Sequence, residues 1–499
     1  MSKNFAASAI WVTVSEIFFN LSGFIIHSIL GRVLGPADYG RYGIIVTLTT
    51  MVIILIGNGI PTAMAKYLSE IYESNPRMIS SIKKQAIRIQ LILIGGITVV
   101  FFLCSSLIAK ALGDPTLTPL FQFSTLIIPA FAAASFYFSY FTGLHKFNVQ
   151  ATLKTVRSIL RIAFVVGLAL FFGLKGSIAG YIFAPAAIFI LAFFIDKFKV
   201  SPELKLRIVE THCNVSLLEP DFDWKKLVNY GWQIIAFFLA YELLISIDLY
   251  MVKGILHDDA LTGIYNASLT VGRIPYYIFY AMTVFLLPMV SKKSAANNNL
   301  KDAKEIINHA MRIMLIFLTP MIVLMSVYAT EILQLLYGKR YLLGAQPMAV
   351  LVFGVGFLTI FYVLSFAANG AGKTITTMWI ALGGLAVNTV LNYFFILRWG
   401  ILGSAIATTI ASFIVMVMML YYIKKHFDAN MNLPEALKVS LVGTLIYFLA
   451  TSLPTGKYLF IPIALAVFAV YLGLLYVLKG ITQDDILYLR SAFKKGKKV

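Results

Sequence analysis

Arg273 is the residue whose type and place in this sequence carry the clearest chemistry. It lies near the middle of an apolar stretch, 261 to 290, where a charged side chain is costly unless it is paired. A guanidinium can hold a compact anion such as a diphosphate through paired hydrogen bonds, and tyrosines nearby can pack on sugar rings. On a helix, the face of Arg273 also carries Thr262, Asn266, Thr270, Tyr277 and Tyr280. The alternative for Arg273 is an intramembrane ion pair with Glu16, Glu242 or Asp248.

A polar stripe follows one face of the first apolar stretch, 9 to 31, and comprises Thr13, Glu16, Asn20, Gly23 and His27. Such a face can line a transport pathway, in which Glu16 or His27 takes up a proton. A buried hydrogen-bond network between helices explains the stripe equally well. We therefore treat Asn20 and His27 as candidate substrate contacts and Glu16 as a candidate coupling residue.

Two acidic residues, Glu242 and Asp248, lie in the seventh apolar stretch, 227 to 252. A helix turns residues at this spacing about 120° apart, so they do not form a pair of carboxylates on one face. We expect Asp248, near the outer end, to lie at the membrane interface. Glu242 is the better candidate for cation coupling or for pairing with Arg273.

Three further groups have interpretations that need no substrate. The basic residues Lys154, Arg157 and Arg161 begin the fifth apolar stretch on its predicted cytoplasmic side, where they form a portal for a diphosphate or, as we favour, an anchor to anionic headgroups. The aromatic run at 136–141 is expected in an interfacial belt. Asn388 and Asn392 are expected to pair with a neighbouring helix or to face the cleft between the two predicted bundles.

The composition shows what positions these groups. The 499 residues are 60% hydrophobic and 13% charged, which is too apolar for a water-soluble surface. Roughly 20 apolar residues cross a bilayer, and the sequence offers about fourteen such stretches. The 41 Lys and Arg residues gather in alternate connections, which predicts a multi-pass protein of the cell membrane with both termini in the cytoplasm. The net charge of +19 therefore reflects basic residues in the cytoplasmic connections and does not indicate a nucleic-acid partner.

The two halves of the chain share a glycine pattern. One block recurs 227 residues later, so that Gly173, Gly176 and Ser177 match Gly400, Gly403 and Ser404. Two copies with an even number of helices have the same orientation, which predicts two pseudo-repeated six-helix bundles around a central cleft. We place the bundles at 1–199 and 226–427, a cytoplasmic linker at 200–225, and two additional helices with a basic tail at 428–499. The predicted fold is thus an all-α integral membrane protein.

Enzyme chemistry is not visible in the sequence. It has no phosphate-binding glycine loop, no zinc-spaced histidine pair and no cluster of carboxylates on a loop. Its two cysteines, Cys104 and Cys213, cannot form a disulfide framework. We therefore predict no cofactor, no metal and no enzyme. A membrane glycan polymerase or ligase is the enzyme alternative, but it would be expected to carry a substantial outer loop.

The motif LGRVLGPADYGRYG at 30–43 predicts a tight turn on the outer face between the first two helices. Proline and glycine supply the backbone angles that such a turn needs, and the structural role fits Gly31, Gly35, Pro36 and Gly40. A structural turn explains these residues better than direct substrate contact does.

With this motif and the stretch GNGIPTAMAKYLSE from Gly57 to Glu70, the chain resembles the polysaccharide transport family of Wzx-like oligosaccharide flippases. That family belongs to the multidrug/oligosaccharidyl-lipid/polysaccharide exporter (MOP) superfamily, and the resemblance spans essentially the whole chain. It implies alternating-access movement of a polyprenyl-diphosphate-linked oligosaccharide to the outer leaflet for cell-surface polysaccharide assembly. It also implies membrane lipid and glycan-assembly proteins as partners.

Two other activities within this superfamily stay open. The first is a cation-coupled multidrug exporter, against which the motif at 30–43 and the mid-membrane Arg273 both argue. The second is a lipid II flippase, also with fourteen predicted spans, which the chain resembles less well at the first turn. The glycan and the energy source, whether proton, sodium, membrane potential or downhill flow, also stay open.

Overall fold

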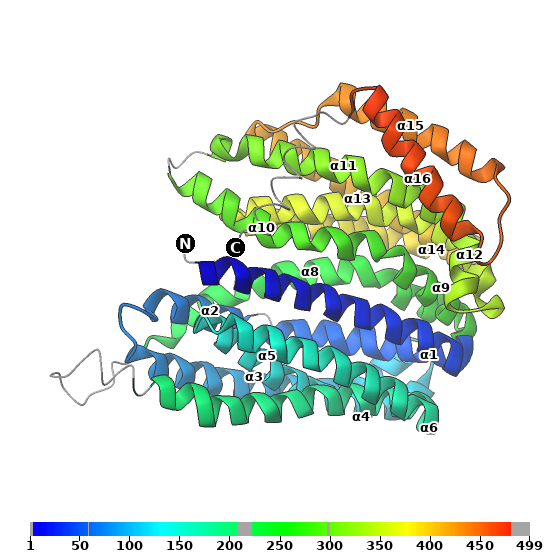
Figure 1. The fold of residues 1–499 in the computed structure, drawn as a ribbon. Coiled ribbons are helices and arrows are strands. Elements are labelled where there is room, and N and C mark those ends of the chain that lie inside the picture. The colour runs from blue at the N-terminus through cyan, green and yellow to red at the C-terminus, as the bar shows by residue number, and fades with distance from the viewer. Residues whose placement is uncertain (1–2, 58, 205, 207–221, 297–299, 481–499) are drawn as a thin grey trace. The chain divides into compact units, whose positions relative to one another are not determined.

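The computed structural model describes residues 3–57, 59–204, 206, 222–296 and 300–480. Over these residues the chain folds into helices joined by short turns, and none of them lies in a β-strand (Figure 1). The predicted all-α fold is thereby confirmed. The side chains of Thr13 and Glu16 and most of the predicted linker lie outside the described part of the chain.

Ten helical segments in the described ranges are long and apolar enough to cross a membrane. Three helices far exceed the roughly 20 residues that one crossing needs: α1 (Lys3–Gly57), α6 (Phe147–Ile195) and α14 (Thr374–Phe427). Each is interrupted inside by a glycine with positive φ, namely Gly35, Gly173 and Gly400. Glycine adopts this backbone readily because it has no Cβ, so each long helix consists of two arms joined at an elbow.

The elbows of α6 and α14 have the same backbone geometry. Gly173 has φ 57° and ψ −136°, and Gly400 has φ 57° and ψ −135°. Three residues after each elbow, a second glycine lies against backbone: a Cβ on Gly176 would overlap the carbonyl oxygen of Leu168, and one on Gly403 would overlap that of Phe395. The glycine block that recurs in the sequence is thus one structural turn used twice. The predicted domain boundaries remain predictions.

Replacing Gly176 or Gly403 by alanine is expected to destabilise the protein by about 1–3 kcal/mol, because the added methyl group meets backbone that cannot move aside. Gly167→Ala in the same α6 is the matched control, since nothing lies within 4 Å of its added Cβ. That change should be neutral or slightly stabilising, because alanine favours helix. The thermal midpoint in detergent measures all three, and an equal loss in Gly167→Ala would contradict the steric explanation.

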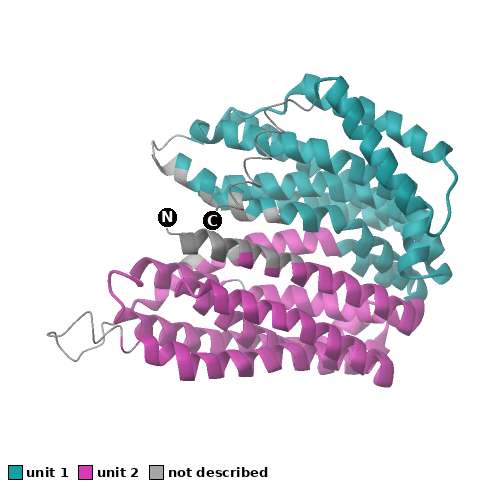
Figure 2. Cartoon of the chain, in the orientation of Figure 1, with its two compact units in different colours: residues 1–7, 247–499 teal, residues 8–246 magenta. Residues whose placement is uncertain are grey.

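The described residues form two compact units (Figure 2). Unit 2, Ser8–Ser246, contains α1 from Ser8 onward, α6 and the first part of α8 (Trp224–Leu256), together with the shorter elements α2 (Ile60–Ile71), α3 (Met78–Ala111), η1 (Pro115–Leu117), α4 (Thr118–Ser124), α5 (Ile127–Gly143) and η2 (Asp196–Val200).

The core of unit 2 lies where α5 packs on α2, α3 and α6. It contains the aromatic run of α5, whose members Phe136, Tyr137, Phe138, Tyr140 and Phe141 are all buried. The expectation of an interfacial belt is therefore wrong. Residues of α2 and α6, distant in sequence, cover this run, and a hydropathy pattern does not show such coverage.

Unit 1 contains Met1–Ala7 and Ile247–Val499. Besides the end of α8 and α14, it holds α9 (Asp259–Gly272), α10 (Ile274–Ala296), η3 (Leu300–Ala303), α11 (Lys304–Val327), α12 (Ala329–Leu336), η4 (Lys339–Gly344), α13 (Ala345–Gly370), α15 (Leu433–Ser452) and α16 (Phe460–Val477). The apolar helix α13 is its centre and packs on α9, α10, α11 and α14. The last two helices attach to α11, where the Tyr471 hydroxyl donates to the Ile316 carbonyl at 2.8 Å.

Candidate functional site

Arg273 lies at a break between two helices of unit 1. Helix α9 ends at Gly272 and α10 begins at Ile274, so the predicted continuous span is interrupted at the arginine. Pro275 explains the break: it lacks an amide hydrogen and clashes with the preceding turn of a helix, but fits the first turn of a new one. Arg273 is half-buried. Its guanidinium thus extends from a helix junction, and not from the side of a straight helix.

Asp248, on α8, is completely buried in unit 1. Its carboxylate accepts hydrogen bonds from the Tyr265 hydroxyl at 2.8 Å and from the Thr408 hydroxyl at 3.2 Å. The positive charge of Arg273 also acts on it. The expectation that Asp248 lies at the membrane interface is therefore wrong, because α9 and α14 cover this side of α8.

The buried network continues along α14 on both sides of its elbow. The amide of Asn392 donates to the Asn388 side-chain oxygen at 2.8 Å, and the Ser404 hydroxyl donates to the Asn392 side-chain oxygen at 2.6 Å. Thr408 reaches the Asn388 oxygen at 3.4 Å. The elbow at Gly400 folds the second arm of α14 back against the first. The two asparagines of the first arm therefore bond to Ser404 and Thr408 of the second.

This network, which we call the Asp248 cluster (Asp248, Tyr265, Asn388, Asn392, Ser404 and Thr408), gathers one carboxylate with hydroxyl and amide oxygens in a buried place. Oxygen donors of this kind suit a hard cation, and a buried carboxylate can also take up a proton. The cluster is thus equipped to bind a small cation. The sequence singled out Asp248 and the two asparagines, and it marked Ser404 only as part of the recurring glycine block. Tyr265 and Thr408 were not predicted as members of the cluster.

Tyrosine rings surround the start of α10. Tyr276 packs on Tyr362 of α13 with ring centroids 4.9 Å apart, and Tyr280 stacks on the same ring at 6.1 Å. Tyr277 lies against Tyr276 at 5.5 Å. The structure thus places Tyr277 and Tyr280 in one aromatic group close in sequence to Arg273. Tyr276 and Tyr362 were not predicted as part of this group. For Tyr362, the available signal is a hydroxyl-bearing ring within an apolar stretch.

Asn266 of α9 is buried, and its side-chain nitrogen finds no hydrogen-bond partner in the described part of the chain. The Thr270 hydroxyl donates to its main-chain carbonyl at 2.8 Å. A buried amide without a partner costs about 1–3 kcal/mol, which makes Asn266 a donor ready for a ligand.

In unit 2, the polar stripe of α1 meets a group of tyrosines. His27 Nδ1 lies 2.9 Å from the Tyr39 hydroxyl, and the His27 ring packs edge-on against Tyr42. The Tyr42 hydroxyl in turn donates to that of Tyr181 in α6 at 3.0 Å. Asn20 is half-buried. His27 is therefore engaged with other parts of unit 2, in keeping with a buried network between helices.

The basic residues of α6 turn toward Phe19 of α1. Arg157 is only 5% exposed, and its guanidinium lies 4.5 Å from the Phe19 ring and 4.3 Å from the Phe131 ring. Arg161 donates to the Phe19 carbonyl at 2.8 Å, while Lys154 lies 5.9 Å from the Phe19 ring. Headgroup anchoring is thus wrong for Arg157, because aromatic rings cover its charge through cation–π contacts.

The first turn is built at Gly35, whose φ of 73° and ψ of 173° interrupt α1, and Pro36 follows it. Gly31 and Gly40 are buried in the flanking arms.

Glu242, the predicted coupling residue of α8, is half-buried.

The overall fold closely matches that of a solved lipid II flippase, MurJ, in its inward closed conformation. The TM-score is 0.71 at 17% identity, covering 95% of this chain and 99% of that one. The chain therefore has the fold of this membrane protein, and the ten long apolar helical segments of its described part are of the length that crosses a bilayer.

The chain belongs to the polysaccharide biosynthesis protein family, whose profile matches residues 5–294. The profile of the lipid II flippase MurJ matches residues 233–479. Among relatives, a candidate O-antigen transporter of Shigella flexneri is 24% identical over 58% of this chain and 66% of that protein. An uncharacterized membrane protein of Methanocaldococcus jannaschii is 24% identical over 44% of this chain, which spans 43% of that relative. The family resemblance found in the sequence is confirmed.

Proposed function

We propose that this protein moves a polyprenyl-diphosphate-linked oligosaccharide across the cell membrane by alternating access, with both termini in the cytoplasm. One observation carries the proposal: Arg273 lies at the junction of α9 and α10, and the first turns of α10 that follow it carry tyrosine rings packed on Tyr362 of α13. The substrate joins a doubly charged diphosphate to sugar rings. The arginine offers a cation to the diphosphate, and the tyrosines offer ring faces to the sugars. The family and the candidate O-antigen transporter among the relatives support the same substrate class.

In this proposal Arg273 binds the diphosphate through paired hydrogen bonds. Tyr277 and Tyr280 offer ring faces and hydroxyl groups to the sugars, and Asn266 offers its amide hydrogens. Asn20 and His27 of unit 2 remain candidate contacts of the glycan, and Lys154 and Arg161 remain candidates for the entry portal. Arg157 is not one of them, because aromatic rings cover its charge.

We further propose that the Asp248 cluster couples transport to a cation. A proton or sodium ion at Asp248 would neutralise the carboxylate that now interacts with Arg273. Arg273 would then be free to bind the diphosphate, so the cation and the anionic substrate would favour each other's binding. Glu16 and Glu242 remain alternative coupling candidates.

The test is the movement of fluorescent glycolipids in proteoliposomes, measured as the fraction that an external quencher can reach. A polyprenyl-diphosphate oligosaccharide, lipid II and a soluble organic dication are compared with protein-free vesicles. Flipping of the oligosaccharide lipid supports the proposal. Export of the dication without movement of either lipid would replace it by a drug exporter.

A lipid II flippase is the second candidate, and a specific observation favours it: the profile of that family matches residues 233–479. Lipid II also carries a diphosphate, so Arg273 would serve both substrates and only the glycan differs. Faster flipping of lipid II than of every other glycolipid in the same assay would select this candidate.

A further inference from the structure

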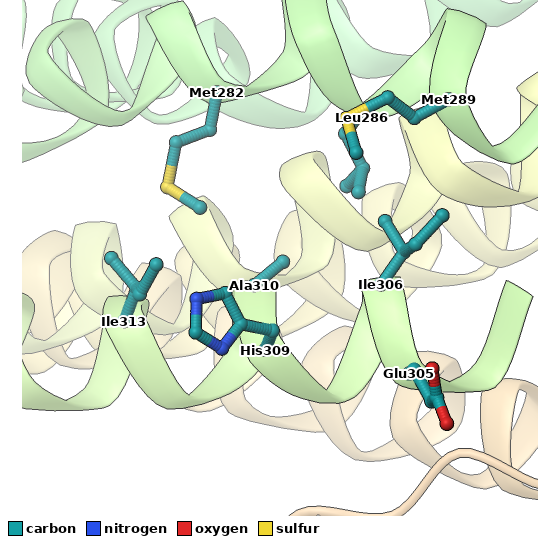
Figure 3. A pocket seen from close by; sticks show the side chains of 8 residues that line it. All are labelled: Met282, Leu286, Met289, Glu305, Ile306, His309, Ala310 and Ile313. Carbon is teal, nitrogen blue, oxygen red and sulfur yellow. The ribbon is translucent and has the colours of Figure 1, made fainter. Parts of the chain in front are cut away.

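Two cavities of unit 1 meet along one face of α11. The first, of about 420 Å³, lies between α10 and α11, and most of its lining residues are apolar, including Met282 and Met289 (Figure 3). The second, of about 320 Å³, lies between α11 and the segment that leads into α15. Glu305 and His309 line both cavities. These two side chains therefore form a ridge with an apolar space on one side and a polar space on the other.

The polar cavity carries charges of both signs. Arg312 pairs with Glu435 at 3.2 Å, and it also donates to the Gly480 carbonyl at 3.3 Å. The backbone amide of Asn430 donates to the Asn308 side chain at 2.9 Å, which holds the cavity wall in place. One guanidinium and two carboxylates, counting the exposed Glu305, thus face a small polar space. This charge pattern complements a group that contains both a phosphate and an amine.

The apolar cavity runs inward from the start of α11. Glu305 lies in the first turn of that helix, and Ile313 is the deepest of the α11 residues that line the cavity. Eight residues of helix rise about 12 Å, which matches a good part of one acyl chain. On the predicted topology, this end of α11 is at the cytoplasmic face. The polar cavity therefore lies at headgroup level and the apolar one at chain level.

We propose that a single phosphatidylethanolamine molecule docks here from the cytoplasmic leaflet. One of its acyl chains fills the cavity between α10 and α11, its phosphate lies near Arg312, and its ammonium group donates to Glu305. Phosphatidylcholine has no N–H to donate, and phosphatidylglycerol has no positive charge to offset Glu305 and Glu435. The site therefore selects a lipid with a protonated primary amine. This inference concerns a lipid that stays bound, and it does not depend on which substrate is transported.

Native mass spectrometry of the delipidated full-length protein tests the proposal. Phosphatidylethanolamine, phosphatidylcholine and phosphatidylglycerol with the same acyl chains are added at equal concentration. The protein should retain about tenfold more phosphatidylethanolamine than either of the other two lipids. Tenfold is the value expected for one charge-assisted hydrogen bond. In Glu305→Gln, the retention of phosphatidylethanolamine should fall to that of phosphatidylcholine. The retention of phosphatidylcholine should be the same as in the wild type.

Met289→Trp fills the apolar cavity and should abolish this preference. Met418→Trp on α14 is the matched control, because the two methionines are 47% and 44% exposed and neither change disturbs a core. Both variants should keep the thermal midpoint of the wild type. Equal retention of the three lipids, or the same loss in both tryptophan variants, would overturn the proposal. Stronger binding of a polyprenyl phosphate than of phosphatidylethanolamine would also overturn it. None of these readouts requires flipping, so they stand apart from the test of the transport function.

Discussion

Replacing Arg273 by alanine is expected to lower the rate of glycolipid flipping at least tenfold. A hydrogen bond to a charged group contributes about 1.5–3 kcal/mol, and losing one such bond to the diphosphate corresponds to roughly 10-fold to 100-fold. Arg273→Lys keeps the charge but loses the planar fork, so it should recover only part of the rate. The measurement is quencher accessibility of a fluorescent polyprenyl-diphosphate oligosaccharide, normalised to the amount of reconstituted protein.

Arg398→Ala is the matched control, because Arg398 is an exposed arginine of α14 that rests against Trp399. Its flipping rate should equal that of the wild type. Arg273→Ala also leaves the buried Asp248 without the charge that offsets it, which can destabilise the fold. The double variant with Asp248→Asn should therefore regain thermal stability without regaining flipping. Wild-type flipping by folded Arg273→Ala would rule out the anion role.

Asp248→Asn is expected to remove the dependence of flipping on an ion gradient. Asparagine keeps the size of the side chain and an oxygen for the Tyr265 hydroxyl, but it has no negative charge to attract a proton or sodium ion. We expect the stimulation by an imposed gradient to fall at least tenfold, while the protein stays folded. Sodium and pH gradients applied separately across the proteoliposome membrane identify the ion.

The control for this change is Asp428→Asn. Asp428 is an exposed carboxylate bound to Lys304 at 2.7 Å, and the neighbouring lysine holds the pKa of Asp428 below its usual value. Removing its charge should leave the gradient response intact. If Asp248→Asn responds to both gradients as the wild type does, the coupling role passes to Glu16 or Glu242.

The two arms of α14 show how the fold builds the Asp248 cluster. Asn388 and Asn392 lie before the elbow at Gly400, and Ser404 and Thr408 lie after it, so a single glycine turn brings four polar side chains together. The equivalent elbow of α6 has the same backbone angles. A turn that recurs in both units thus contributes to the Asp248 cluster in unit 1.

Much of the fold follows from the sequence by itself. Apolar length predicts membrane helices because backbone polar groups must be satisfied within the segment in lipid. The glycine block predicts equivalent turns because a positive φ is a property of the local backbone, and the structure has these turns at Gly173 and Gly400. The break at Arg273 also follows from Pro275, a local signal that apolar length alone does not contain. The family, too, is visible in the motif at 30–43.

The burial of individual polar groups was decided only by the tertiary structure. Asp248 is near a span end by sequence, yet Thr408, 160 residues away, helps to bury it. The position of Arg157 in the sequence predicts a headgroup anchor, but in the fold Phe19 and Phe131 cover its charge. Periodicity gives the face of a helix on which a residue lies, but not which other helix packs there. Packing between distant segments therefore determines whether such a charge faces lipid headgroups, a cation or another side chain.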